Sequence, residues 1–346
     1  MNAELLLADR SPCLRLLVLR NCLGLRASHP EVKELAALRQ SDPFAAAVIG
    51  SQEPEGSWPD PNGPRSSARA ESGRLIATSV ALSRLSLLGF TPSHPAIQRG
   101  AAFLFSRQKP DGSWPLPSHA DGGRYSMMPL QTALPLAGLA RAGFAEDPRA
   151  ERAYDWLLSK RLEDGAWPTG IASGVRGFVG GYRRLPHSRW GCRSNTTAAL
   201  ICLAHHPKRK RSDEARMALD HLLARETRDR ASLGFEPARV MGFEPVRGFV
   251  TFHAVFDPAL VLDLCARLGA SVEDARVAEL AGFVRSCASP SGLWEYRSNP
   301  LATRWVTYVI HSALTTLETP PRGGKGWVWI QPRTPFQAYP RARRRY

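Results

Sequence analysis

Four segments of this sequence share one short pattern, in which a tryptophan follows a glycine at the second position. The tryptophans recur along most of the chain, as Trp58, Trp114, Trp167 and Trp294. A weaker copy, Ser232-Leu233-Gly234-Phe235, has phenylalanine in the tryptophan position. Self-similarity of this kind is the signature of a chain built from repeated structural units. We therefore expect a repeat protein, and the remaining residues must show which elements make up one unit.

Helical periodicity flanks each copy of the pattern. Before the second copy, Ile97, Ala101, Leu104 and Phe105 have the spacing of one apolar helix face, which indicates a helix with its other side in solvent. After each copy comes a segment that is apolar almost all round and therefore typical of a buried helix. These segments span residues 75–90, 126–144, 196–205, 258–268 and 305–317. One unit is thus an outer amphipathic helix, a turn and an inner buried helix.

Closing such units into a ring gives the predicted fold. A further helix pair, around residues 12–23 and 30–39, would supply a sixth inner element. We expect an all-α chain, an α/α toroid of about six helix pairs whose inner ring lines a central cavity. In the turns, glycine permits positive φ at the end of the outer helix, and the indole packs between helices with its N–H on a carbonyl. The four tryptophans are therefore predicted to be structural.

The repeat also resembles that of a known family. Gln108, followed by Asp111-Gly112-Ser113-Trp114, is similar to the Gln-x-x-x-Gly-x-Trp repeat of terpenoid cyclases, such as squalene–hopene cyclase, and of protein prenyltransferase β subunits. The resemblance extends over about residues 43–318. It implies an α/α toroid with an apolar central cavity that accepts isoprenoid chains.

The family's catalytic residues are not matched in this chain. The segment that best resembles the cyclases' acid motif, residues 193–199, contains no carboxylate to protonate an alkene. Of the prenyltransferases' zinc ligands only Cys192 is matched, since Trp190 stands in the Asp position and Val306 in the His position. One ligand does not make a zinc site, so we expect no metal and no cofactor. Cys192 and Asp257 are weak catalytic candidates.

Arginine recurs at the start of the predicted inner helices, as Arg74, Arg124, Arg193 and Arg304. Equivalent positions in a ring lie on the same rim, where helix N-termini add further positive charge. An Arg-rich mouth over an apolar hollow suits an amphiphile with an anionic head, such as a prenyl diphosphate. The alternative is that these arginines pair with carboxylates of neighbouring turns.

Charge and cysteine usage bear on partners and location. The formal net charge of +15 indicates anionic ligands or surfaces. The six cysteines are scattered without metal-ligand spacing, which is typical of reduced thiols, and no apolar stretch reaches the length of a membrane span. We expect a cytoplasmic protein. Residues 1–42 are expected to join the toroid of residues 43–318, and the basic residues 319–346 to form a partly disordered tail that contacts an anionic membrane or nucleic acid.

Two function classes follow. The first is the handling of an isoprenoid-type ligand, a prenyl diphosphate or terpenoid, in the toroid cavity, with catalysis left open and a non-standard site if the protein is an enzyme. The second is a catalytically degenerate toroid that acts as a binding scaffold for an anionic lipid, a protein or nucleic acid.

Overall fold

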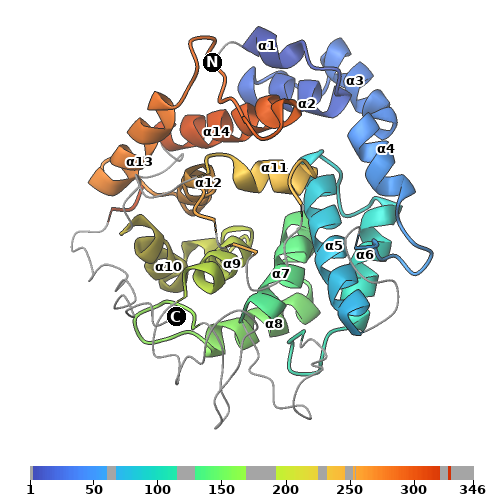
Figure 1. Ribbon diagram of the computed structural model, residues 1–346, viewed down its shortest axis with the longest axis vertical. Coiled ribbons are helices and arrows are strands. Elements are labelled where there is room, and N and C mark those ends of the chain that lie inside the picture. The colour runs from blue at the N-terminus through green and yellow to red at the C-terminus, as the bar shows by residue number, and fades with distance from the viewer. Residues whose placement is uncertain are drawn as a thin grey trace, which may run out of the picture.

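The computed structural model of the chain describes residues 3–60, 68–114, 129–168, 192–224, 232–245, 252–253, 255–319 and 326–328. In this part of the chain the elements are helices without any strand, and the one isolated bridge joins Ala270 to Trp327. Figure 1 shows the helices arranged as a ring of inner and outer layers. The chain is thus an all-α, α/α toroid, as the sequence repeat predicted.

Among the described residues the inner layer consists of five helices, and consecutive members pack against one another. They are α5 (Ala68–Leu87), α7 (Pro129–Leu139), α9 (Arg193–Ala204), α12 (Pro258–Leu268) and α14 (Thr303–Glu318). Every residue of α7 and all of α9 except Arg193 are buried, which explains why these segments are apolar all round. Three short helical turns adjoin the layers: η3 (Ala140–Phe144), η4 (Arg209–Arg211) and η6 (Pro300–Ala302).

The outer helices bury only one side. They are α4 (Pro43–Gly50), α6 (Pro95–Ser106), α8 (Pro148–Ser159), α10 (Asp213–Leu223) and α13 (Ala275–Ser286). In α8 the buried residues include Ala150, Ala153 and Leu157, at helical spacing, and the opposite face is polar. Several of these helices begin after a side-chain cap; Asp147, for instance, accepts the backbone N–H of Arg149 at 2.9 Å.

The four tryptophans occupy equivalent positions in the turns. Each indole Nε1 donates to the backbone carbonyl ten residues earlier in the outer helix, as Trp114 does to Leu104 at 2.8 Å. Each tryptophan backbone N–H donates to a threonine hydroxyl of the following inner helix, as Trp114 does to Thr132 at 3.2 Å. The turn glycine has positive φ in all four, +91° at Gly112. These turns therefore join each outer helix to the next inner one.

The preceding glutamine links neighbouring outer helices in two of the copies. Gln108 Nε2 donates to the carbonyl of Gly112 in its own turn and to that of Arg149, in the first turn of α8. Gln52 does the same to Gly56 and to Ala96 in α6. The outer layer is thus held by side-chain bonds to backbone carbonyls.

The weaker fifth copy departs from this pattern. Gly234 also has positive φ, +82°, but its N–H donates to Asp257, and Phe235 follows it directly as the first residue of α11 (Phe235–Met241). Figure 1 shows α11 inside the ring, between α14 and α5. The structure here differs from the expectation of a fifth outer turn, because the chain turns inward at this glycine.

The ring is closed at the junction between its last and first inner helices. From the inside, α11 contacts α14, α12 and α5. From the outside, this junction is covered by α1 (Ala3–Leu7), α2 (Pro12–Leu17), η1 (Val18–Cys22), α3 (Pro30–Ala37) and η2 (Leu38–Ser41). Asn21 donates to the Tyr308 hydroxyl at 2.6 Å, and Arg39 to the Gly89 carbonyl at 2.7 Å. The N-terminal pair thus covers the junction from outside and does not supply the sixth inner element that was expected, because α11 occupies the inner side.

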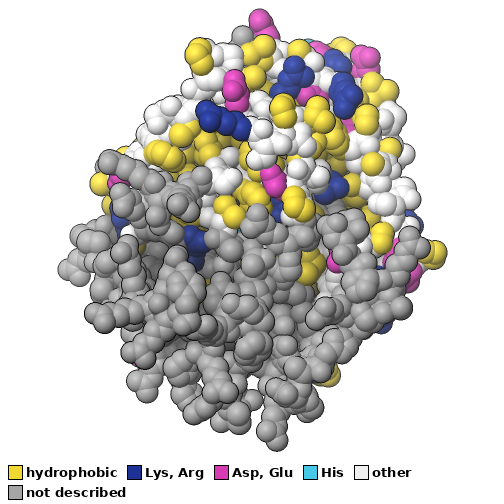
Figure 2. All heavy atoms as spheres, viewed as in Figure 1, with side chains coloured by type: hydrophobic (Ala, Val, Ile, Leu, Met, Phe, Trp, Pro, Cys, Tyr) yellow, Lys and Arg dark blue, Asp and Glu magenta, His cyan; other side chains and the backbone are white. Residues whose placement is uncertain are grey.

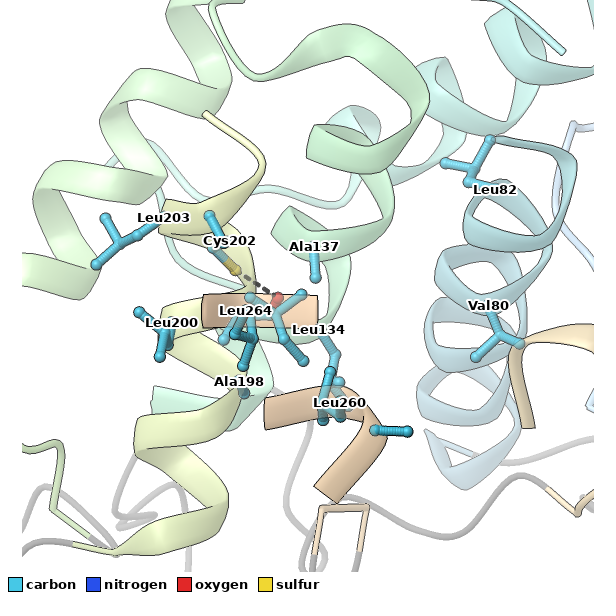
Figure 3. Packing of buried hydrophobic residues seen from close by; sticks show 14 of the residues in the cluster. Val80, Leu82, Leu134, Ala137, Ala198, Leu200, Cys202, Leu203, Leu260 and Leu264 are labelled. Atoms are coloured by element: carbon cyan, nitrogen blue, oxygen red, sulfur yellow. Dashed lines mark hydrogen bonds between the residues drawn. The ribbon is translucent and has the colours of Figure 1, made fainter. Parts of the chain in front are cut away.

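The apolar core runs through the contacts between inner helices. Figure 3 shows Leu134 of α7 on the side of α9 that carries Ala198, and these two side chains are buried, as are Ala137 and Leu200. Cys202 lies in the same layer, where its Sγ donates to the carbonyl of Ala133 at 3.1 Å. On the face seen in Figure 2, the described side chains are a mixture of hydrophobic, basic and acidic types. Burial of the apolar surfaces between helices is the main term that stabilises the ring.

Candidate functional site

Helix α11 carries charged side chains into the centre of the toroid. Two residues position it: Gly234 before it and Gly242 after it both have positive φ, which turns the chain sharply at each end. Asp257 fixes its start, since the two carboxylate oxygens accept the N–H groups of Gly234 at 2.8 Å and Glu236 at 2.7 Å. The same carboxylate accepts the N–H of Ala259 and so caps α12 as well.

Glu236 is the carboxylate at the middle of this cluster. Arg239, one helical turn later on α11, donates to its Oε2 through Nε at 3.1 Å and also through its Nη2. Arg141, at the end of the second inner helix, reaches its Oε1 through Nη2 at 3.4 Å. Two guanidinium groups therefore share a single carboxylate.

Burial and charge set the protonation states of the cluster. Burial raises the pKa of Glu236, but the charges of Arg239 and Arg141 outweigh it and lower that pKa to about 2. Burial lowers the pKa of His253 to about 3. It also lowers the pKa of His205 well below its ordinary value, so the Nε2 of this neutral ring accepts from Arg141 Nε at 3.4 Å. The cluster near neutral pH therefore holds an ionised glutamate, two arginines and neutral histidines.

A cavity of about 360 Å³ lies beside this cluster, between α5, α11, α12, α14 and the N-terminal helices. Its polar lining includes Arg141, His205 and Glu236, together with Asp263 and Arg267, which form an ion pair at 2.7 Å. Its apolar lining consists of Leu17, Leu87, Pro237, Val240, Leu260 and Val309. The interior is thus not the wholly apolar hollow that was expected, because α11 fills part of it and brings charge into it.

A second cavity of about 630 Å³ adjoins the first and shares Asn21, Asp263, Arg267 and Tyr308 with it. Hydroxyl-bearing residues, among them Thr315 and Thr316 of α14, line much of it. Leu87, Arg141 and His205 of the first cavity lie at or just after the C-terminal ends of α5, α7 and α9. None of the arginines of the predicted rim that the structure describes lines either cavity.

The structure places three of the four arginines of that rim. Arg74 pairs with Glu55 at 3.3 Å, and Arg304 pairs with Asp9 at 3.1 Å, so both have carboxylate partners from neighbouring segments. Arg193 is the first residue of α9, with its guanidinium 5.8 Å from the ring centroid of Phe256. Arg124 lies outside the described residues.

The two weak catalytic candidates lie apart from the cavities. Cys192 is the N-cap residue of α9, and its backbone N–H donates to the carbonyl of Trp167 at 2.6 Å. Asp257 is 3% exposed, and its oxygens are occupied by the three backbone donors described above. Burial raises the pKa of Asp257 to about 7. Neither residue lines either of the two cavities described above.

Two of the positions expected for zinc ligands carry Trp190 and Val306, whose side chains have no atom that binds zinc. Trp190 lies outside the described residues, and Val306 is buried with a methyl group packed against Gly234. Across the described ranges no three His, Cys, Asp or Glu side chains are grouped as a metal site would need. The same part of the chain has no helix that is both long and apolar enough to cross a membrane.

Sequence reasoning did not single out the two arginines of this cluster and did not bring its members together. Arg141, Arg239 and His205 stand at the ends of apolar helices, where a charged residue reads as an ordinary helix terminus. One signal was present: Gly-Phe-Glu-Pro occurs twice, at 234–237 and 242–245. Its two glycines bound α11, so the duplication marks the inward turn.

Comparison with known proteins places part of the chain in a family context. Residues 46–183 match the family model of the squalene-hopene cyclase C-terminal domain. The squalene–hopene cyclase of Zymomonas mobilis subsp. mobilis is 29% identical over 165 residues, which are 45% of this chain and 23% of that enzyme. The chain thus matches about a quarter of the length of this relative.

Two solved structures illustrate the likeness of fold. A variant of the type II terpene cyclase MstE from Scytonema, in complex with geranylgeranyl dihydroxybenzoate, has a TM-score of 0.47 at 15% identity, over 82% of this chain and 77% of that one. A protein from Actinoplanes has a TM-score of 0.32 at 15% identity, over 83% of this chain and 100% of that one.

Proposed function

We propose that this chain, which is a terpenoid cyclase-like protein through its residues 46–183, binds an isoprenoid-type ligand in the 360 Å³ cavity at the centre of the toroid. The observation that supports this is the composition of that cavity. Leu87, Leu260 and Val309 form an apolar wall opposite the charged groups of α11 and Arg141. Its volume falls at the lower end of the range for small-molecule sites, roughly 300–1,000 Å³.

An amphiphile fits this arrangement better than a plain hydrocarbon or a sugar. A hydrocarbon would leave the buried polar groups of the wall without partners, and that is unfavourable. A sugar would leave the leucines and valines facing polar groups. A prenyl chain with a polar head satisfies both sides, with the chain on the apolar wall and the head toward α11.

The cavity walls do not supply an acid for alkene protonation. Among the described residues the carboxylates that line the cavities are Glu236 and Asp263, and each forms an ion pair with arginine. With its pKa lowered to about 2, Glu236 holds no proton to donate near neutral pH. We therefore propose binding of the ligand, and place no cyclisation chemistry on these residues.

The second candidate function is a scaffold with no isoprenoid ligand. The pairing of Arg74 with Glu55 and of Arg304 with Asp9 favours it, because paired arginines are less available to an anionic head. In that case the net charge of +15 would attract an anionic partner, which could be a protein, a lipid or a nucleic acid.

Direct binding measurements separate the two candidates. Wild-type protein is titrated with geranylgeraniol and with geranylgeranyl diphosphate, and the same titrations are made with Val309→Trp, which fills the cavity, and with Leu301→Trp. Leu301 is 59% exposed and lies away from both cavities. We expect binding by wild type and Leu301→Trp, and at least tenfold weaker binding by Val309→Trp. Absence of binding by the wild type would favour the scaffold.

A further inference from the structure

The central cluster of the toroid contains more positive than negative charge. Beside α11 lie Arg84, Arg141 and Arg239, whereas the described carboxylates in contact with this helix are Glu236 and Asp257. Even with both carboxylates ionised, the cluster keeps one positive charge in excess. With the pKa of Asp257 raised to about 7, part of its compensating charge is also lost near neutral pH.

The contacts of each arginine show where the excess lies. Arg84 donates through Nε to the carbonyl of Val240 at 2.6 Å, a contact with the C-terminal turn of α11, and forms no ion pair with a carboxylate in the described part of the chain. Arg239 is 1% exposed and forms a close ion pair with Glu236. Its guanidinium carbon stacks over the ring of Phe252, 3.6 Å from the ring centroid. Its remaining nitrogen, Nη1, is buried without a hydrogen-bond partner among the described residues. A buried donor of this kind is unfavourable unless a ligand or water occupies it.

The cavity gives access to this excess charge. Arg141 and Glu236 line the 360 Å³ cavity and also a small void of about 10 Å³ behind it, whose walls include Arg239 and His253. That void is about the size needed for one water molecule. Arg141 therefore faces the cavity directly, and Arg239 faces it through a space that one water can bridge.

Arg141 is held in place but is only weakly neutralised. Its two Nη atoms lie 3.4 and 3.5 Å from Glu236 Oε1, near the limit of a hydrogen bond, because Arg239 occupies the other oxygen at closer range. The neutral ring of His205 accepts from its Nε at 3.4 Å. Its side chain is 15% exposed, toward the cavity that it lines. This is an oriented guanidinium with capacity for one further acceptor.

We propose that Arg141 binds the anionic head of the ligand, with Arg239 contributing through a bridging water. This rests on the function proposed above and assigns the ligand class, an isoprenoid with a phosphate or carboxylate head. The anion supplies the negative charge that the two arginines lack when they share Glu236. The head thus lies beside Arg141 and α11, and the prenyl chain lies along Leu87, Leu260 and Val309.

The test compares a charged and a neutral ligand of the same chain length. Geranylgeranyl diphosphate and geranylgeraniol are titrated into wild type and into Arg141→Met, Arg141→Lys and Arg304→Met. We expect wild type to prefer the diphosphate, Arg141→Met to bind the diphosphate about tenfold or more weakly, and its affinity for the alcohol to stay the same. Arg141→Lys keeps the charge without the planar fork and should lose less. Arg304→Met should behave as wild type.

Each other outcome has a distinct meaning. An unchanged preference for the diphosphate in both Arg141 variants would overturn the assignment of the head to Arg141. A loss in Arg304→Met with none in Arg141→Met would overturn it in favour of the predicted arginine rim. Absence of binding of either ligand to the wild type would refute the proposed function itself.

A second variant tests the charge excess independently of Arg141. Glu236→Gln removes the shared carboxylate and leaves two arginines without an ionic partner. This variant should be less stable alone, yet the diphosphate should raise its Tm by more than it raises that of wild type, because a bound anion now replaces the missing charge. An equal or smaller rise would contradict the proposal.

Discussion

The backbone N–H of Trp114 donates to the hydroxyl of Thr132, 3.2 Å away at the start of the next inner helix. The same pair recurs as Trp58 with Thr78, Trp167 with Thr196 and Trp294 with Thr307. All these groups are buried, so each bond satisfies a polar group that water cannot reach. Each repeat therefore contributes a turn and also a hydrogen bond that joins this turn to the following inner helix.

Removal of one such hydroxyl should destabilise the fold measurably. Thr132→Val keeps the shape of the side chain but leaves the N–H of Trp114 buried and unpaired, which we expect to lower the free energy of unfolding by about 1–3 kcal/mol. Urea denaturation followed by tryptophan fluorescence measures this. Thr91→Val, at an exposed threonine, is the control and should change stability by less than about 0.5 kcal/mol. Equal effects of the two substitutions would show that the layer bond contributes nothing.

The turn glycines should tolerate no side chain. At Gly112, φ is +91° and an added Cβ would lie 2.4 Å from the carbonyl oxygen of Arg152. Gly112→Ala should therefore destabilise the protein severely. Gly282→Ala is the matched control, since Gly282 lies within α13 and an added Cβ would meet nothing within 4 Å; it should be neutral or stabilise by about 0.5–1 kcal/mol. Thermal melts of both variants check this, and similar melting temperatures would contradict it.

Acid should destabilise the central cluster in a defined pH window. The pKa of Glu236 is lowered to about 2 in the folded state, so its contribution is fully present above its ordinary pKa and is lost as the pH falls toward 2. The pKa of His253, lowered to about 3 by burial, acts in the same direction, since this ring gains its proton more readily in the unfolded chain below about pH 6.5.

Urea midpoints measured from pH 7 down to pH 2.5 test this window. Below about pH 4.5 the stability of the wild type should fall as the pH decreases, and that of Glu236→Gln should fall less steeply. Between about pH 7 and pH 4 the raised pKa of Asp257 acts in the opposite direction in both proteins, because this carboxyl binds its proton more readily in the folded chain. Glu318→Gln removes an exposed carboxylate that pairs with Arg285 and should keep the wild-type slope. A Glu236→Gln profile parallel to that of the wild type would argue against ionised Glu236 as a stabilising group.

The cysteines should differ strongly in reactivity. Burial raises the pKa of the Cys13, Cys202 and Cys265 thiols, so they hold little thiolate at pH 8, whereas Cys287 is exposed. Alkylation under native conditions, followed by peptide mass spectrometry, should label Cys287 first and the three buried thiols only after unfolding. Early labelling of Cys202 would mean that the contact between the second and third inner helices opens readily.

Purified protein should contain no stoichiometric zinc. Cys192 is the one side chain matched to a zinc ligand, and the buried Val306 occupies the expected histidine position. Elemental analysis after dialysis measures the metal content. About one zinc per chain, lost on Cys192→Ala, would contradict this expectation and revive a prenyltransferase-like site.

The helices and their assignment to the inner or outer layer could be predicted from the sequence. This was possible because the burial of a helix determines which of its residues are apolar and at what spacing they recur. Residues 258–268 were predicted as an inner helix and form α12 with the same bounds. The charged cluster at the centre of the toroid could not be predicted in this way. Helix α11 is short, and its charged residues Glu236 and Arg239 sit one turn apart, a spacing that equally describes a solvent-exposed pair. These two residues are buried because the chain turns inward at Gly234. This turn depends on contacts of α11 with helices that are distant in the sequence, such as α5.

The predicted arginine rim illustrates the same limit at the level of the site. Sequence position places Arg74 and Arg304 at equivalent helix ends, but it does not show that Glu55 and Asp9 lie opposite them. Conversely, Arg141 and Glu236 are far apart in the chain, and no local pattern connects them. Of the predicted basic tail, the structure describes residues 319 and 326–328. There the indole Nε1 of Trp327 donates to the carbonyl of Leu268 at 2.8 Å.

Closure of the ring by α11 has a consequence for the order in which the chain can fold during synthesis. The surface of α5 that α11 contacts belongs to the first third of the chain, whereas α11 is made in the last third. Until then a nascent chain exposes this flank of α5, which has no permanent partner. Long-range closure of this kind slows folding, and the open intermediate is the species most exposed to aggregation. A growing chain of this protein therefore has a late, vulnerable interval that ends only when the ring closes.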